Sequence, residues 1–197
     1  MAALLAHVPG GRRTNTPERI LVIRLGNIGD IVVALPAFHA LRTRFSNAHM
    51  TLLTSPTRRG AAGAREVLAN DDTFDDMIVY YADESQKPAF LRNLKAQIHA
   101  RQIDTAVLLP NHMASFTSIA KYIGLLASAG VRRIIGHQLV TPADYAVRQV
   151  DRLITLIHPL DITGVPPLPW LHAKPEEKAK ADQFLGDFSG RPLVAMH

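Results

Sequence analysis

Cysteine is absent from this chain of 197 residues. The protein can therefore form no disulfide, no thiolate zinc site and no cysteine nucleophile, and the composition favours a reducing compartment such as the cytoplasm. No apolar run reaches the roughly 18 residues that a transmembrane helix needs. The nine histidines show neither H-x-H nor H-E-x-x-H spacing, so the sequence predicts no metal site.

Acidic residues are in the minority, because 17 Asp and Glu face 22 Lys and Arg and leave a formal net charge of +5. Such a balance favours an anionic partner, for example a phosphorylated substrate, a nucleotide or an anionic membrane face. Dispersed, solvated arginines would give the same count. No basic stripe with interleaved aromatic residues is present, so nucleic acid is not an expected partner.

From residue 20 onward the chain alternates buried strands with helices. Strands are predicted at 20–25, 49–54, 77–81, 105–109 and 133–136, and helices at 31–45, 60–69, 88–101, 115–127 and 145–157. This succession of βα units without hairpin turns between them indicates an α/β fold, a Rossmann-like, doubly wound, mainly parallel sheet with 20–25 as a central strand. Pro36 is expected either to kink the first helix or to begin its main body.

The sequence also predicts where this domain begins and ends. Residues 1–18 lack the basic start and the A-x-A cleavage site of a signal peptide and are expected to form a flexible tail. The alternating pattern fills 19–158. The proline-rich start of 159–190 indicates an interdomain linker followed by a helix. Residues 191–197 are expected to be the first strand of a truncated second domain, or else a further strand of the first sheet.

The most informative segment is RLGNIGD at 24–30, the turn after the first strand. In a doubly wound sheet this turn usually lies at the ligand-binding edge, and its glycines permit positive φ and close approach of a ligand. The segment matches neither the G-x-G-x-x-G fingerprint nor a P-loop. A carboxylate at this place suits proton abstraction from a hydroxyl better than phosphate binding, which makes Asp30 a candidate general base. The alternative is that Asp30 is a helix N-cap and that Asn27 and the glycines are only turn residues.

Residues 24–45, R-L-G-x-I-G-D-x-V-x-x-x-P-A-x-x-A-L-R-x-R-F, resemble the amino-terminal motif of the glycosyltransferase family 9 heptosyltransferases. Two later stretches agree with this family. Residues 129–136 are similar to its A-G-V-x-x-R-I-G motif, and 150–153 (VDRL) are similar to its V-E-R-Y/L helix. The resemblance extends over 20–197, because the final PLVAMH stretch is similar to the approach to the family's second domain.

This resemblance implies the amino-terminal half of a GT-B architecture, in which two Rossmann-like domains face a cleft. The first domain, 19–158 here, would bind the acceptor, and the second the nucleotide-sugar donor. It implies an inverting, metal-independent bacterial heptosyltransferase that uses no cofactor, with ADP-heptose as donor and the lipopolysaccharide inner core as anionic acceptor. Asp30 would be the catalytic base, and this chain alone would be inactive. The location implied is cytoplasmic, with a peripheral contact at the cytoplasmic face of the inner membrane.

Further residues are candidates for acceptor binding. Gly26, Asn27 and Gly29 surround the candidate base. Arg58 and Arg59 follow the second strand and would bind phosphates or carboxylates bidentately, unless they are solvated loop residues. A polar segment after the fourth strand adds three candidates that would line the cleft, or that cap the next helix: Asn111, His112 and Ser115.

Two other classes of protein compete with this interpretation. A nucleotide-binding Rossmann oxidoreductase domain would need an acidic residue at the end of the second strand, where this sequence has Thr54, Ser55 and Pro56. A non-catalytic α/β binding module would use the same cleft without chemistry.

Overall fold

The computed structural model describes residues 16–56, 58–85, 87, 89–111, 114–137, 147–164, 171 and 173–186. Two sequence-based predictions lie outside these residues: the role of His112 and the strand at 191–197. Most of the predicted tail, up to residue 15, lies outside them as well.

The centre of the molecule is a parallel sheet with the strand order β3-β2-β1-β4-β5. Its strands are β1 (Arg19–Ile23), β2 (His49–Thr54), β3 (Asp76–Val79), β4 (Thr105–Leu108) and β5 (Arg133–Ile135). The predicted α/β fold and the central place of the first strand are therefore confirmed. Each of the five predicted strands is present in the described part of the chain, and α7 (Gln149–Ile157) follows β5.

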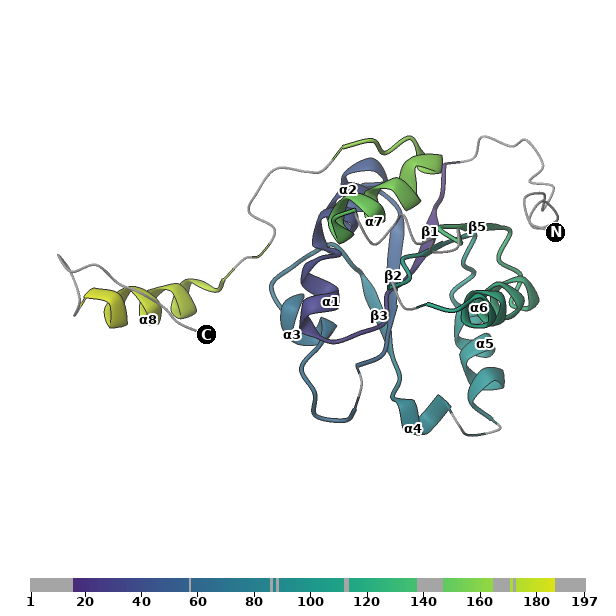
Figure 1. Cartoon of the computed structure of the whole chain (residues 1–197), viewed down its shortest axis with the longest axis horizontal. Coiled ribbons are helices and arrows are strands. Elements are labelled where there is room, and N and C mark those ends of the chain that lie inside the picture. The colour runs from purple at the N-terminus through teal and green to yellow at the C-terminus, as the bar shows by residue number, and fades with distance from the viewer. Residues whose placement is uncertain are drawn as a thin grey trace.

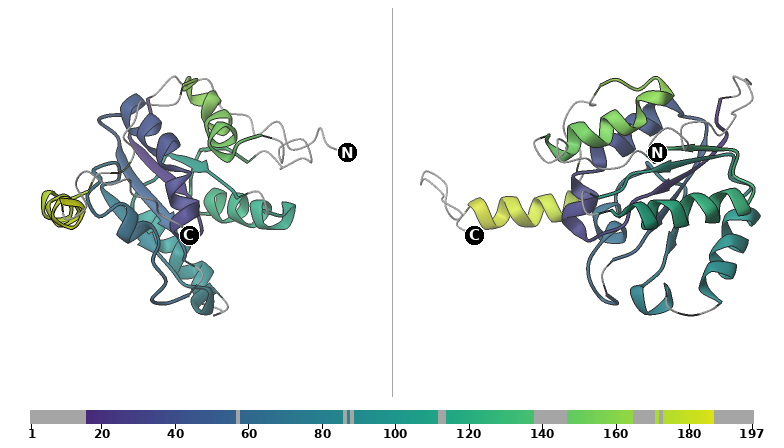
Figure 2. Two further views of the ribbon diagram at one scale, coloured as in Figure 1. Left: turned by 60° about the vertical axis from the view of Figure 1, so that its left-hand side comes forward. Right: turned by 45° about the vertical axis from the view of Figure 1, so that its right-hand side comes forward.

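The two faces of the sheet are apolar because side chains alternate along each strand. On β1, Ile20 and Val22 point to one face, while Leu21 and Ile23 point to the other. The first face is covered by α2 (Leu35–Arg44) and α7, and the second by α5 (Phe90–Ala100) and α6 (Phe116–Ser128). Figure 2 (right) shows α7 on one side of the sheet and α6 on the other, which makes three layers.

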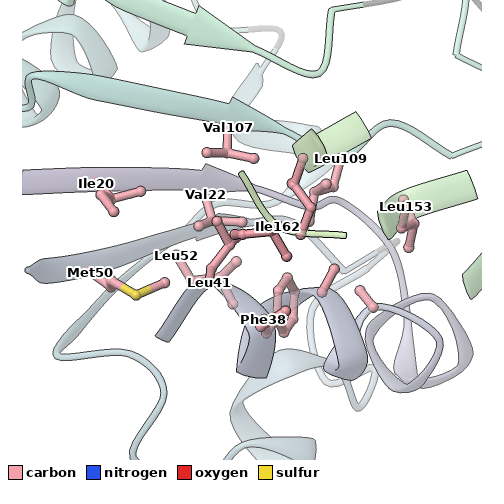
Figure 3. Close-up of a cluster of buried hydrophobic side chains, with 14 of the residues drawn as sticks. Ile20, Val22, Phe38, Leu41, Met50, Leu52, Val107, Leu109, Leu153 and Ile162 are labelled. Atoms are coloured by element: carbon pink, nitrogen blue, oxygen red, sulfur yellow. The ribbon is translucent and has the colours of Figure 1, made fainter. Parts of the chain in front are cut away.

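The larger core lies between the sheet and α2 with α7 (Figure 3). Phe38 and Leu41 of α2 and Leu153 of α7 are fully buried there against strand residues. Ile162, which follows the 3-10 turn η2 (His158–Leu160), packs into the same cluster. The chain therefore contributes to this core as far as Ile162.

The helices differ from the sequence-based prediction in two places. The single helix expected at 31–45 is divided into α1 (Ile28–Val32) and α2, and Pro36 lies in the first turn of α2, where its missing N–H costs nothing. The short helix α4 (Ala82–Ser85) was not predicted. The other two are α3 (Ala64–Val67) and α8 (Pro175–Gly186), which begins with acidic residues as expected and contains no buried residue.

Candidate active site

The strand order places the candidate site between β1 and β4. From β1 the chain proceeds through β2 to β3 on one side and then crosses to β4 and β5 on the other (Figure 1). In open α/β sheets, ligands bind outside the carboxyl ends of the strands at the point where the order reverses. The segments that follow these two strands, 24–30 after β1 and 109–111 after β4, meet at this switch point.

Gly26 shapes the turn after β1. Its φ is +137°, a conformation that other residues rarely adopt, and a Cβ at this position would overlap the Asp30 carboxylate. Its N–H donates to the carbonyl oxygen of Ser55 at 3.1 Å, which ties the turn to the end of β2. Gly29 has neither constraint, because a Cβ there would meet nothing within 4 Å.

Asp30 lies in the first turn of α1 and is anchored there by its own side chain. The N-cap of α1 is Asn27, so the prediction that Asp30 is itself an N-cap is wrong in position. Instead, Oδ2 of Asp30 accepts a hydrogen bond of 3.2 Å from the backbone N–H of Asn27, as an acidic residue at the third helical position does in a capping box. The side chain remains 37% exposed, so its carboxylate is both fixed and accessible.

The side chain of Arg24 forms two hydrogen bonds with Asp30. Its side chain is only 1% exposed, and its Nη2 donates to Oδ1 of Asp30 at 3.2 Å. Its Nε donates to the backbone carbonyl of the same residue at 2.9 Å. Burial lowers the pKa of Arg24 to about 10, against the opposing effect of the Asp30 charge, so the guanidinium remains a cation at neutral pH.

Two more contacts join the segments after β1 and β4. Nη1 of Arg24 donates to the carbonyl oxygen of Leu109 at 3.1 Å. Arg152 of α7, also buried, donates from Nη1 to the next carbonyl, that of Pro110, at 3.0 Å. The VDRL stretch therefore contacts the switch point. Sequence reasoning assigned no role to Arg24 or Arg152, although each is a charged residue within an otherwise apolar buried pattern.

The residues that follow β4 have different places. Ser115 is the N-cap of α6, and its Oγ accepts from the N–H of Ser118 at 3.2 Å. The capping alternative for Ser115 is therefore what its contacts show. Asn111 is half-buried at the end of β4, at the switch point itself. Contacts of these residues with an acceptor stay predictions.

The two arginines that follow β2 differ in their contacts with neighbouring carboxylates. Arg59 donates from Nη2 to Glu84 at 2.6 Å and from Nε to Asp83 at 3.4 Å. Its guanidinium also lies over the ring of Tyr81, 4.4 Å from the centroid. Arg58 and Arg59 are both exposed, but an anionic ligand would have to compete with two carboxylates for Arg59.

Within the described part of the chain, no three side chains of His, Asp or Glu gather as the ligands of a metal ion would. None of the helices in the described ranges has the length and apolar character needed to cross a membrane.

Comparisons with known proteins give structural neighbours only. No protein-family model matches the sequence, and no curated protein matches it either. The crystal structure of the glycosyl transferase family 9 protein from Veillonella parvula is similar with a TM-score of 0.57 and 19% sequence identity, over 87% of this chain. That likeness establishes the Rossmann-like fold. The chain covers 50% of the Veillonella protein and so spans about half of its length.

A second neighbour is the E. coli heptosyltransferase WaaC, in a structure with ADP. The TM-score is 0.46 and the sequence identity 15%, over 76% of this chain and 49% of that one.

Proposed function

We propose that this protein is an inverting, metal-independent glycosyltransferase and that residues 19–158 form its acceptor-binding domain. The observation that supports this most strongly is the Asp30 carboxylate, which is fixed at the switch point by Arg24 and Asn27 and is still accessible. A base placed in this way can accept a proton from a hydroxyl group that enters the crevice.

The proposed reaction is a direct displacement. Each oxygen of the Asp30 carboxylate accepts one hydrogen bond in the structure, and a carboxylate has about four lone-pair positions, so an acceptor hydroxyl can still bind. As the hydroxyl oxygen attacks the anomeric carbon of the donor sugar, its proton passes to Asp30. The bond between that carbon and the diphosphate oxygen breaks, and the nucleoside diphosphate leaves with the electron pair. Attack from the opposite side inverts the anomeric carbon.

The proposed donor and acceptor rest on the resemblance of the sequence motif. The match of residues 24–45 to the family 9 motif supports ADP-heptose as donor and the inner core of lipopolysaccharide as acceptor. As the family resemblance implies, we propose that the donor subsite lies in a second domain that begins at 191–197 and is joined by 159–190. Such an enzyme would work in the bacterial cytoplasm, in peripheral contact with the inner membrane.

An anionic acceptor agrees with the charge of the chain. The formal net charge is +5, and Arg58 is exposed close to the end of β2, at the same edge of the sheet as Asp30. A positive field of this kind raises the local concentration of an anionic substrate. Gly26, Asn27, Gly29 and Asn111 would line the path of that substrate.

A transfer assay with the full-length protein tests the proposal. Parallel reactions contain the protein, the lipopolysaccharide inner-core acceptor and one of four compounds: ADP-heptose, UDP-glucose, GDP-mannose or NAD. Matched reactions leave out the acceptor. We expect acceptor-dependent release of ADP from ADP-heptose and an acceptor mass increased by one heptose. Transfer from another donor would keep the enzyme class and correct the sugar. A rise in the melting temperature with NAD alone would identify an oxidoreductase. Binding of the acceptor without transfer from any donor would identify a binding module.

A further inference from the structure

Arg24 is at the centre of the contacts that join the two segments of the switch point. Its backbone N–H donates to the carbonyl of Leu53 at the end of β2. Its side chain bonds to Asp30 after β1 and to Leu109 after β4. One buried residue therefore contacts the ends of three neighbouring strands.

We propose that Arg24 is a positioning residue for the proposed transfer reaction. Arg24 determines where the Asp30 carboxylate lies relative to the acceptor. This inference rests on the proposed function, because it assigns a residue to the same site. The Arg24 side chain is buried, with only 1% of it exposed. It acts through Asp30.

The geometry restrains Asp30 at two points. Nε of Arg24 fixes the backbone carbonyl, and Nη2 fixes Oδ1 of the side chain, at 2.9 and 3.2 Å. The third bond, from Nη1 to Leu109 at 3.1 Å, sets the same guanidinium against the end of β4. Because the guanidinium is planar and rigid, these three partners are held in one fixed arrangement. A lysine ammonium has no such fork and cannot hold all three in the same directions.

Fold stability alone does not explain a cation at this place. Burying a guanidinium is costly, and a well-packed apolar side chain often replaces a buried ion pair without loss of stability. Here the lowered pKa of Arg24 reflects that cost. A buried cation that fixes an accessible carboxylate at the carboxyl edge of the sheet is explained if the position of that carboxylate determines the rate of a reaction. Displacement of a reacting group by about 1 Å can cost roughly 10²-fold in rate.

Arg42 offers a matched control at the opposite edge of the sheet. It makes the same kind of contacts, donating to the carbonyls of Thr73 and Ala48 and to the carboxylate of Asp75 at 2.9, 2.8 and 2.6 Å. Thr73 and Asp75 precede β3, and Ala48 precedes β2. This cluster therefore lies at the amino ends of the strands, away from the switch point where Asp30 lies. Arg42 is 22% exposed and Arg24 only 1%, so Arg42→Lys controls for the loss of a three-partner contact, and the free energy of unfolding of each variant accounts for the difference in burial.

The test is a double-mutant cycle in the full-length enzyme, with kcat expressed per folded molecule. We expect Arg24→Lys to lower kcat by roughly 10- to 100-fold, with the acceptor KM changed by less than about threefold, and Arg42→Lys to leave both constants near wild type. In the Asp30→Asn background, Arg24→Lys should lower kcat by less than about threefold, because the group that it positions is no longer a base.

Three results would overturn the inference. The first is a loss of kcat on Arg24→Lys that is equally large in the Asp30→Asn background. The second is a loss of kcat on Arg24→Lys that is no larger than the loss on Arg42→Lys. Arg24→Gln, which keeps an amide donor and removes the charge, replaces Arg24→Lys if the lysine variant does not fold. Failure of both variants to fold, the third result, assigns Arg24 to stability alone. Normal activity of Asp30→Asn by itself is a different outcome, because it rejects the base and with it the proposed mechanism.

Discussion

The Asp30 carboxylate lies directly against the Cα of Gly26, in the space that a side chain at residue 26 would need. The two residues are four positions apart, and the turn between them begins with the positive φ of Gly26. The accessible position of Asp30 therefore depends on the absence of a side chain at one particular glycine. This contact distinguishes the two glycines of the RLGNIGD segment.

We expect Gly26→Ala to destabilise the fold by about 1–3 kcal/mol, because it combines positive-φ strain with a clash against Asp30. Gly29→Ala is the control. It lies within α1 with open space around its Cβ position, so alanine should be neutral or stabilising by up to about 1 kcal/mol. Urea unfolding of the two variants measures the difference. Equal free energies of unfolding would show that Gly26 is not constrained as described.

Arg58 and Arg59 should contribute unequally to acceptor binding. Because Arg59 is engaged by Glu84 and Asp83, Arg59→Ala should change the acceptor KM by less than about threefold and the stability by less than about 1 kcal/mol. Arg58→Ala removes an exposed cation and should raise the acceptor KM by roughly 10-fold, the effect of about 1.4 kcal/mol. Steady-state kinetics at fixed donor concentration compare the two. A larger effect at Arg59 would mean that the acceptor displaces the carboxylates.

The largely buried carboxylate of Asp71 gives the fold a predictable acid sensitivity. Asp71 is only 9% exposed, with Nε2 of His39 at 2.6 Å from its Oδ2 and the N–H of Thr73 donating to its Oδ1 at 2.8 Å. Burial alone would raise the pKa of Asp71, but the bonds from Thr73 and His39 outweigh it and hold the pKa below the ordinary value of 3.8. The ionised form is thus favoured by folding, so this contribution is present above about pH 4 and is lost as the pH falls further.

We therefore expect Asp71→Asn to be less stable than wild type by about 1–3 kcal/mol at pH 7, with the difference narrowing toward pH 3. The exposed neighbour Asp72 supplies the control, since Asp72→Asn should stay within about 0.5 kcal/mol at every pH. Urea unfolding between pH 7 and pH 3 measures both. A difference for Asp71→Asn that is as large at pH 3 as at pH 7 would show that folding does not favour the ionised form of Asp71.

The strands were predictable because their signal is local. The run at 20–25 is almost entirely apolar, as a strand buried on both faces requires, and the structure buries Ile20 and Leu21 on opposite faces. The helix α4 was missed because its residues, Ala-Asp-Glu-Ser, contain no apolar stripe. The error has a consequence for the site, since α4 supplies the carboxylates that engage Arg59.

The position of Asp30 could be predicted from the turn after β1, but its support could not. Arg24 follows an apolar strand, and sequence alone does not distinguish a solvated arginine from one that is 1% exposed. Its burial depends on the Leu109 carbonyl, which is 85 residues away in the chain and becomes a neighbour only when β4 pairs with β1. Long-range pairing of this kind has no local sequence signal.

The contact between Asp30 and buried Arg24 means that Asp30→Asn should affect stability as well as activity. Asp30→Asn removes the charge that faces buried Arg24 and should cost about 1–3 kcal/mol of stability, so activity has to be expressed per folded molecule. Asp161→Asn is a suitable control. Asp161 is exposed and has a φ of 60°, which asparagine also tolerates, so this variant should match the wild type in rate.

The most direct test of the account is the kcat of Asp30→Asn in the full-length enzyme, at saturating acceptor and donor. If Asp30 is the general base of sugar transfer, kcat falls by roughly 10²- to 10⁴-fold while Asp161→Asn remains at the wild-type rate. If Asp30→Asn retains more than about a tenth of the wild-type kcat, less than the loss of a general base should cost, the carboxylate serves the fold and not the reaction.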